Sequence, residues 1–153
     1  MTPSKGVCLV IYAYGDDGAD EKKKRVVAVS ILAGYEDWWK ELEHLWTVRC
    51  GGIPFHATDC ESDQEDYKDR SHEENKSMYR DLTELPAASG IGGLGSAVDL
   101  VAEREVFPKA PPIAYYKVFL DCLERLANLA ENLNDVCEVT YDISAENESN
   151  AAS

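Results

Sequence analysis

The chain has 153 residues, of which 44% are hydrophobic and 29% are charged, a composition typical of one globular domain rather than of a disordered or fibrous chain. The 15 Lys and Arg residues stand against 29 Asp and Glu residues, which gives a net charge of −14. This balance excludes a broad nucleic-acid surface, because such a surface needs clustered Lys and Arg to neutralise phosphates. It does not exclude a local site in which bound divalent cations reverse the sign of the pocket.

Two features of the sequence bear on where the protein works. The longest apolar run, residues 7–13, is too short to cross a bilayer, and no signal for export is recognisable, so we expect no membrane association. The five cysteines include no Cys-x-x-Cys pair. An odd set of unpaired thiols is typical of a reducing compartment and predicts a cytoplasmic protein.

The first half of the chain predicts two strands and two helices. Residues 7–14 form a continuous apolar, β-branched run that ends at a Gly-Asp-Asp-Gly segment, residues 15–18, which predicts a buried strand followed by a turn. Residues 25–32 predict a second strand, and the short connection predicts an antiparallel hairpin. Aromatic residues at helical spacing predict a helix over residues 35–47. A loop and then a helix over residues 71–85 are expected next, with Ser71 and Glu74 forming a capping box.

The second half predicts a strand, a long helix and a final strand. The strand at residues 97–101 follows a glycine-rich segment, and the helix covers residues 113–133. Residues 136–143 alternate polar and apolar side chains, which is typical of a strand with one polar face. Residues 144–153 are small, polar and acidic and predict a flexible tail. The whole pattern predicts one α/β domain over residues 1–143, a mixed sheet flanked by helices.

Acidic residues lie in or at the end of three predicted strands: Asp16 beside Asp17, then Asp99, then Asp142. A carboxylate among buried apolar neighbours is costly unless it is paired or holds a metal ion. Three acids on separate strands therefore indicate oxygen ligands for Mg²⁺ or Mn²⁺, ions that activate water and stabilise the leaving oxygen in phosphodiester cleavage. Each acid could equally cap a turn, so both interpretations stay open.

Several short motifs resemble a known family when they are taken in order. They are Ala-Tyr-Gly-Asp-Asp-Gly at residues 13–18, an apolar strand that ends at Gly34, Trp38-Trp39, and Phe-His-Ala-Thr-Asp at residues 55–59. This order resembles a large, uncharacterised prokaryotic and phage domain family with an N-terminal Asp-Glu-Ser-Gly or Asp-Asp-Ser-Gly strand and a Phe-His-x-x-Asp segment. The resemblance covers about residues 7–143. It implies a ribonuclease-H-like fold and a metal-dependent nuclease, which is a hydrolase acting on nucleic acid.

The resemblance also assigns roles to individual residues. The implied metal ligands are Asp16, Asp142 and, as a looser match, Asp99. The implied catalytic residues are Asp16, Asp17, His56 and Asp59. His56 would shuttle a proton or contact a phosphate, since its unperturbed pKa lies near neutrality. The alternative for His56 is a loop histidine that is simply tied to Asp59.

Other interpretations remain open. Gly18 stands where the family has Ser, and family members continue with a further strand and an acid-bearing helix, so a short, inactive relative is one alternative. Another is an acidic binding protein, a nucleic-acid mimic or a partner of a basic protein. Its contact face would be residues 56–85, which hold ten acids and four bases. A third is a homo-oligomer that associates through exposed aromatic residues such as Tyr115.

Overall fold

The protein is described by a computed structural model that covers residues 8–19, 25–109 and 113–142. The predicted tail at residues 144–153 lies outside this description. The chain divides into two compact units, one formed by residues up to Tyr35 together with those from Gly93 onward, and the other by Glu36–Gly92. Within the described residues, no helix is both long enough and apolar enough to span a membrane.

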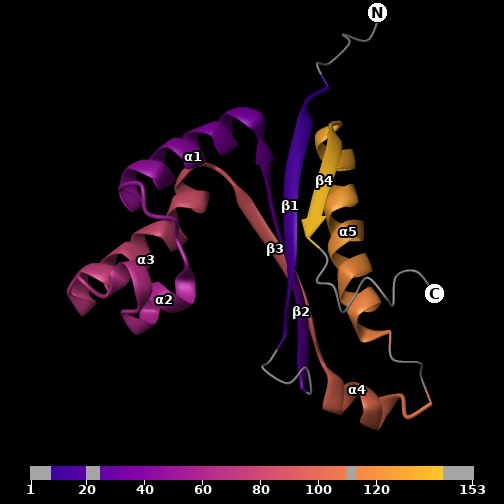
Figure 1. The fold of residues 1–153 in the computed structure, drawn as a ribbon. Coiled ribbons are helices and arrows are strands. Elements are labelled where there is room, and N and C mark those ends of the chain that lie inside the picture. Colours follow the sequence, from indigo (N-terminus) through magenta and orange to yellow (C-terminus); the bar gives the residue numbers. More distant parts are fainter. Residues whose placement is uncertain (1–7, 20–24, 110–112, 143–153) are drawn as a thin grey trace, which may run out of the picture. The chain divides into compact units, whose positions relative to one another are not determined.

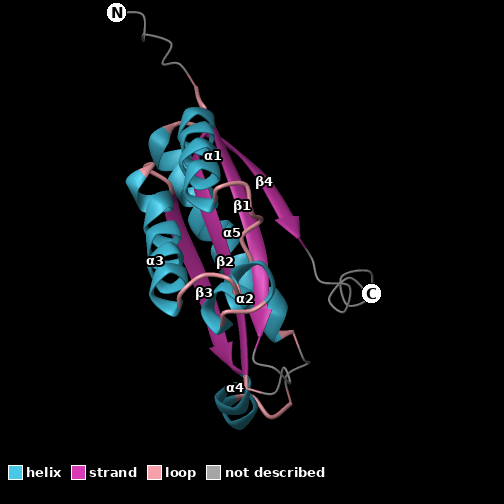
Figure 2. Ribbon diagram, turned by 60° about the vertical axis from the view of Figure 1, so that its left-hand side comes forward, coloured by secondary structure: helices cyan, strands magenta, loops and turns pink. Residues whose placement is uncertain are grey.

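The first unit is built on a mixed sheet with the strand order β3-β2-β1-β4 (Figures 1 and 2). Strand β1 (Val10–Ala19) pairs antiparallel with β2 (Val26–Tyr35) and parallel with β4 (Val136–Asp142). Strand β3 (Gly92–Asp99) forms the opposite edge of the sheet. The predicted α/β class, a mixed sheet flanked by helices, and the predicted antiparallel hairpin are both confirmed.

Helix α5 (Ala114–Leu133) covers one face of this sheet and creates the core of the first unit. Side chains alternate between the two faces of a strand, and the odd-numbered residues of β1 and β2 are the ones packed against α5. The buried residues of this core are Ile11, Ala13, Val29, Ile31, Ala33, Val118, Cys122, Leu126 and Ala130. The even-numbered residues of β1 and β2 therefore lie on the face opposite α5.

The second unit is helical. It contains α1 (Glu36–Cys50), α2 (Ala57–Ser62), a short 3₁₀ helix η1 (Glu65–Tyr67) and α3 (His72–Ala88). The predicted capping box is confirmed, because Ser71 and Glu74 each accept a hydrogen bond from the other's backbone N–H. The buried core consists of Cys50, Cys60, Tyr67, Met78 and Leu82.

The predicted turn at residues 15–18 is wrong. Strand β1 continues through this segment, and its ladder with β2 extends from the Ile11–Tyr35 pair to the Ala19–Val27 pair. Pairing with β2 thus overrides the local turn preference of Gly and Asp. Gly15 is required here for a different reason, since a Cβ at this position would lie 2.5 Å from Cδ2 of Tyr141.

The segment after residue 90 also differs from the sequence-based expectation. The glycine-rich stretch is itself the body of β3, and the strand ends at Asp99 rather than at residue 101. Residues 100–106 form a further helix, α4 (Leu100–Val106). The carboxylate of Asp99 starts this helix by accepting hydrogen bonds from the backbone N–H groups of Val101 and Ala102, at 2.9 and 3.1 Å.

Candidate functional site

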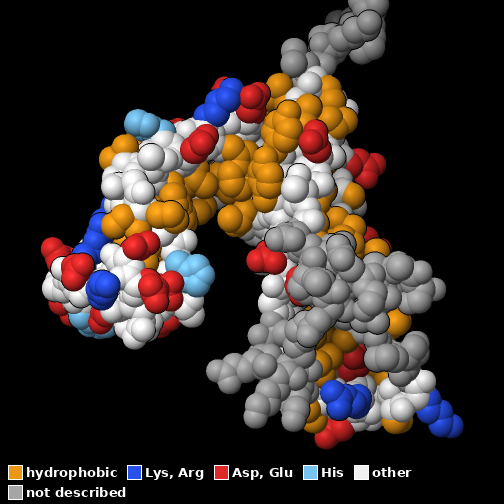
Figure 3. All heavy atoms as spheres, in the orientation of Figure 1, with side chains coloured by type: hydrophobic (Ala, Val, Ile, Leu, Met, Phe, Trp, Pro, Cys, Tyr) orange, Lys and Arg blue, Asp and Glu red, His pale blue; other side chains and the backbone are white. Residues whose placement is uncertain are grey.

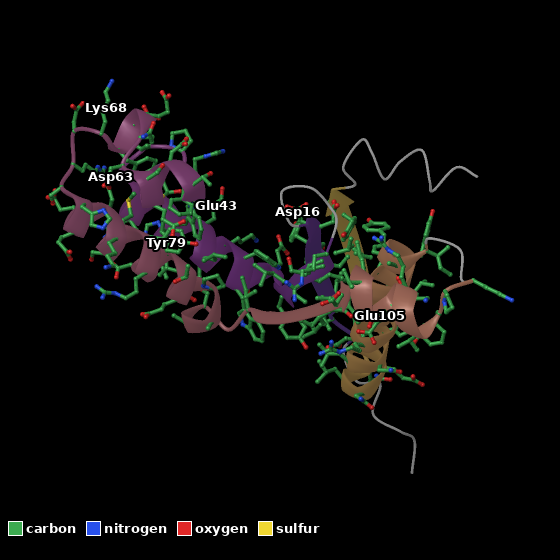
Figure 4. The ribbon with its side chains drawn as sticks, turned by 90° about the horizontal axis from the view of Figure 1, so that it is seen from below. Asp16, Glu43, Asp63, Lys68, Tyr79 and Glu105 are labelled. Atoms are coloured by element: carbon green, nitrogen blue, oxygen red, sulfur yellow. The ribbon has the colours of Figure 1, made fainter. Side chains whose placement is uncertain are left out.

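The sheet register brings two of the predicted metal ligands side by side. In the parallel ladder between β1 and β4, Asp16 is the partner of Asp142. Neighbouring strands lie about 4.8 Å apart, so the backbones of these two residues are adjacent although they are distant in sequence. Both residues lie near the carboxyl ends of their strands, where open α/β sheets bind their ligands. Figure 4 shows Asp16 on β1, beside β4. The side chain of Asp142 lies outside the described part of the chain.

Asp16 is held in a defined position by its neighbour. Its carboxylate is exposed and accepts a hydrogen bond of 2.8 Å from the backbone N–H of Asp17. As an even-numbered residue of β1, Asp16 lies on the face of the sheet opposite α5.

Asp17 lies on the other face of the sheet, near two phenol groups. Burial is the main cause of the raised pKa values of Tyr115 and Tyr141, and the negative charge of Asp17 raises both pKa values further. Tyr115 is half-buried, and its ring stacks on that of Phe119 with 6.1 Å between the centroids. It therefore does not provide the exposed aromatic surface that a homo-oligomer built on this residue needs.

Asp99 does not join Asp16 and Asp142. It caps α4, and it forms an ion pair of 3.6 Å with Arg25, which immediately precedes β2. The cap hydrogen bonds from α4 and then the Arg25 charge lower the pKa of this carboxyl group. In β2 the partner of Asp16 is Ser30, and the five-residue step from Arg25 to Ser30 corresponds to about 16 Å of strand. The capping interpretation of Asp99, left open by the sequence, is the one that the structure supports.

His56 and Asp59 belong to the second unit. The His56 side chain is 69% exposed, and its Nδ1 lies 3.0 Å from Oδ2 of Asp59. Thr58 Oγ1 lies 3.3 Å from the same ring nitrogen. The backbone N–H of His56 donates a hydrogen bond of 3.2 Å to the hydroxyl group of Tyr67. The histidine is thus tied to Asp59, as one sequence-based interpretation predicted, with its second ring nitrogen not engaged by Asp59.

The strand residues on the face opposite α5 include partly exposed side chains. Tyr14 is 48% exposed, and its β2 partner Leu32 is 38% exposed. Glu138 and Thr140, on β4, are also exposed and pair with Tyr12 and Tyr14. None of the residues in the four strands is Lys or Arg. The charged side chains of the four strands are therefore all acidic.

A hard divalent cation is the ligand that the sequence predicts for this edge of the sheet. Mg²⁺ is commonly bound by only one or two carboxylates, with waters and substrate phosphate oxygens as the remaining ligands. Of the two predicted acids, the structure describes the side chain of Asp16, which is exposed, and the backbone of its register partner Asp142. Among the described side chains, which leave out that of Asp142, no three His, Cys, Asp or Glu residues are grouped closely enough to hold a metal ion.

Sequence reasoning missed a polar cluster in the second unit. His72 Nδ1 lies 2.8 Å from Oδ2 of Asp63, and the fully buried Asn75 donates to Oδ1 of Asp63 at 2.9 Å. The hydrogen bond from Asn75, followed by that from His72, lowers the pKa of Asp63. His72 also lines a cavity of about 450 Å³ together with Cys60, Glu61, Lys76 and Tyr79. The left-handed backbone of Asp63 (φ 56°) brings these residues together, and no spacing in the sequence signals it.

Comparison of the chain with family models, with curated proteins and with solved structures finds no match. The family resemblance noted in the sequence therefore stays a prediction. The functional argument depends on the geometry of the site and on the chemistry of its side chains.

Proposed function

We propose that the protein hydrolyses phosphodiesters with the help of Mg²⁺ or Mn²⁺ held by Asp16 and Asp142, and that its substrate is a nucleic acid. The observation that carries this proposal is the Asp16–Asp142 partnership at the carboxyl ends of the parallel strands β1 and β4. The ribonuclease-H-like resemblance implies the same two acids, and this agreement between register and motif supports the proposal.

The reaction needs few groups from the protein. When bound, the divalent ion supplies an activated water and neutralises charge on the phosphate. The water oxygen forms a bond to phosphorus, the bond from phosphorus to the leaving oxygen breaks, and a proton moves from the water to the leaving oxygen. The products are a phosphomonoester and an alcohol. Asp16 would act as a ligand, and its carboxylate accepts a hydrogen bond from the backbone N–H of Asp17.

The resemblance implies that His56 carries a proton, and this role is proposed from the resemblance alone. The Nδ1 of His56 faces the carboxylate of Asp59, an arrangement that fixes the ring and leaves Nε2 to accept or donate a proton. We expect His56→Ala to lower the rate of hydrolysis without weakening metal binding. An unchanged rate would identify His56 as a structural loop residue.

Titration calorimetry with Mn²⁺ tests the metal site directly. The wild type should bind the ion, and Asp16→Asn combined with Asp142→Asn should abolish binding. Asp99→Asn is the matched control, because Asp99 caps α4 and pairs with Arg25, and it should leave binding unchanged. Cleavage of single-stranded and duplex oligonucleotides of DNA and RNA should require the ion and disappear in the double variant. A wild type that binds no divalent ion would refute the proposal.

The acidic binding protein remains the second candidate, and one observation favours it. Charged side chains gather over α2 and α3 in Figure 3, and acids of this segment such as Glu61, Glu65, Asp66 and Glu73 are exposed. A basic protein partner would bind there in a salt-sensitive complex that survives the Asp16→Asn and Asp142→Asn substitutions. Failure to retrieve such a partner at low salt as well as high salt would count against this function.

The cytoplasm is the proposed location of this activity. All five cysteines lie within the described residues, and each is a free thiol. Free thiols persist in a reducing compartment. In an oxidising compartment, exposed Cys8 would be the first cysteine to form a disulfide. Mass spectrometry of the protein purified without reductant can detect this disulfide.

A further inference from the structure

We infer that the cavity between α2 and α3 binds a free amino acid with an apolar side chain. The cavity has a volume of about 450 Å³ and is lined by Cys60, Glu61, His72, Lys76 and Tyr79. All of these residues belong to the second unit, Glu36–Gly92. The inference is therefore independent of the sheet and of the proposed nuclease function, and it gives a ligand to a cavity that neither candidate function uses.

The first argument is the size of the cavity and its apolar wall. Sites for small molecules commonly have volumes of about 300–1,000 Å³, with a mostly apolar lining and a few polar groups. Cys60 is fully buried and belongs to the core of the second unit. Tyr79 is half-buried and packs against the same core, with its ring centroid 6.0 Å from that of Phe55. This wall is thus preformed, and an apolar side chain can bind against it.

The second argument is that the cavity is lined by charges of both signs. Glu61 comes from α2 and Lys76 from α3. Within the described residues, neither side chain is engaged in an ion pair. A ligand with both an ammonium and a carboxylate group satisfies the two side chains at once, whereas a ligand with a single charge meets a like charge at one of them. Residues 56–85 hold ten acids and four bases, and a ligand without net charge is not repelled by this excess.

The third argument is the fixed orientation of His72. Its Nδ1 lies 2.8 Å from Oδ2 of Asp63, and the fully buried Asn75 donates a hydrogen bond of 2.9 Å to Oδ1 of the same carboxylate. These hydrogen bonds lower the pKa of Asp63, so its carboxylate is ionised near neutral pH and only accepts. The ring proton is therefore on Nδ1, and Nε2 of the neutral ring is an acceptor. His72 can thus accept a hydrogen bond from the ammonium group of the ligand.

Titration calorimetry of the full chain with L-leucine, L-methionine and L-phenylalanine tests the inference. At least one of the three should bind, and glycine, which has no side chain, should bind more weakly. For the amino acid that binds most tightly, the N-acetyl derivative lacks the ammonium group and the amide derivative lacks the carboxylate. Each derivative should have a Kd about 10- to 100-fold higher than the parent amino acid, because a charged hydrogen bond is lost. This comparison uses the wild type alone, so the fold is unchanged.

Two substitutions assign each charge of the ligand to a side chain. Lys76→Gln should raise the Kd of the amino acid about 10- to 100-fold and leave the Kd of its amide unchanged. Glu61→Gln should raise the Kd of the amino acid to a similar extent and leave that of the N-acetyl derivative unchanged. Lys68→Gln and Glu84→Gln are the matched controls, because both residues are exposed and belong to the same unit but do not line the cavity. Both controls should bind the amino acid as the wild type does.

Three results would overturn the inference. They are that none of the three amino acids binds, that both derivatives bind as tightly as the parent amino acid, or that Lys76→Gln and Glu61→Gln bind it as the control variants do. Asp16→Asn combined with Asp142→Asn should leave amino-acid binding unchanged, since no residue of the first unit lines the cavity. Loss of amino-acid binding in this double variant would place the site elsewhere and overturn the inference as well. The cavity and the proposed metal site are thus tested separately.

Discussion

Gly15→Ala is the substitution whose effect the structure predicts most sharply. The new Cβ would lie 2.5 Å from Cδ2 and 2.8 Å from Cε2 of Tyr141, and 3.1 Å from Cγ1 of Ile31. The Tyr141 ring has little freedom to move away, because it packs edge-on against Phe119 with 4.8 Å between the ring centroids. Relief of the clash must therefore displace core side chains or the backbone that carries Asp16.

Two opposing effects set the change in the free energy of unfolding caused by Gly15→Ala. Overpacking a core costs about 1–3 kcal/mol, whereas replacing Gly by Ala in an unstrained backbone stabilises by about 0.4–1 kcal/mol through the unfolded state. The expected net effect of Gly15→Ala is a loss of about 0.5–2 kcal/mol in the free energy of unfolding. In a Tyr141→Val background the two shortest contacts are removed, and the 3.1 Å contact with Ile31 remains. The same substitution should then be close to neutral, because the remaining contact opposes the gain of about 0.4–1 kcal/mol from the unfolded state.

Urea unfolding of the four members of this double-mutant cycle measures the coupling between the two positions. Gly18→Ala is the matched control, because Gly18 lies in the same strand and a Cβ there would meet no atom within 4 Å. It should be neutral or slightly stabilising. The reasoning is refuted if Gly15→Ala is as mild as Gly18→Ala, or if its cost persists unchanged when Tyr141 is replaced.

Three further predictions concern the second unit and the thiols. Hydrogen bonds from Asn75 and then from His72 lower the pKa of Asp63 in the folded protein. The ionised carboxylate therefore stabilises the fold at pH values above the unfolded-state pKa. This stabilisation is lost as the pH falls through the lower pKa of the folded state. Urea unfolding between about pH 5 and 2 should therefore show that the free energy of unfolding falls less on acidification for Asp63→Asn than for the wild type. Asn75→Ala, which removes a fully buried side chain with two hydrogen bonds of 2.9 Å, should cost about 1–3 kcal/mol, and a cost near zero would contradict the network. Ellman's reagent should modify exposed Cys8 before Cys60, since burial raises the pKa of the Cys60 thiol; equal rates would show that the second unit opens readily.

Much of the secondary structure could be predicted from local patterns. Helical spacing located the long helix at residues 113–133, and the Ser71–Glu74 pair located the start of α3, because both signals are contained within a few residues of chain. The prediction of a turn at the Gly-Asp-Asp-Gly segment was wrong for the same reason, because it used only local sequence. Its local preference is for a turn, but the ladder with β2 supplies backbone hydrogen bonds that only a partner strand can provide.

The candidate site also depends partly on local patterns and partly on long-range strand pairing. The apolar runs indicated Asp16, Asp99 and Asp142 in the same way, because each is an acid in or after such a run, and only the resemblance ranked Asp99 lower. Register separates them, since β1 pairs with β4 so that Asp16 meets Asp142, while Asp99 meets Arg25 at the far end of β2. The cluster of Asp63, His72 and Asn75 had no spacing signal at all.

The sequence by itself determined the α/β class, the main helices and strands, and which carboxylates deserve a functional test. The tertiary structure alone decided which of those acids are register partners in the sheet, Asp16 and Asp142, and which one caps a helix, Asp99. The physical reason is that side-chain periodicity is a property of a short stretch of chain, whereas strand order and register depend on hydrogen bonds and core packing between segments far apart in the sequence.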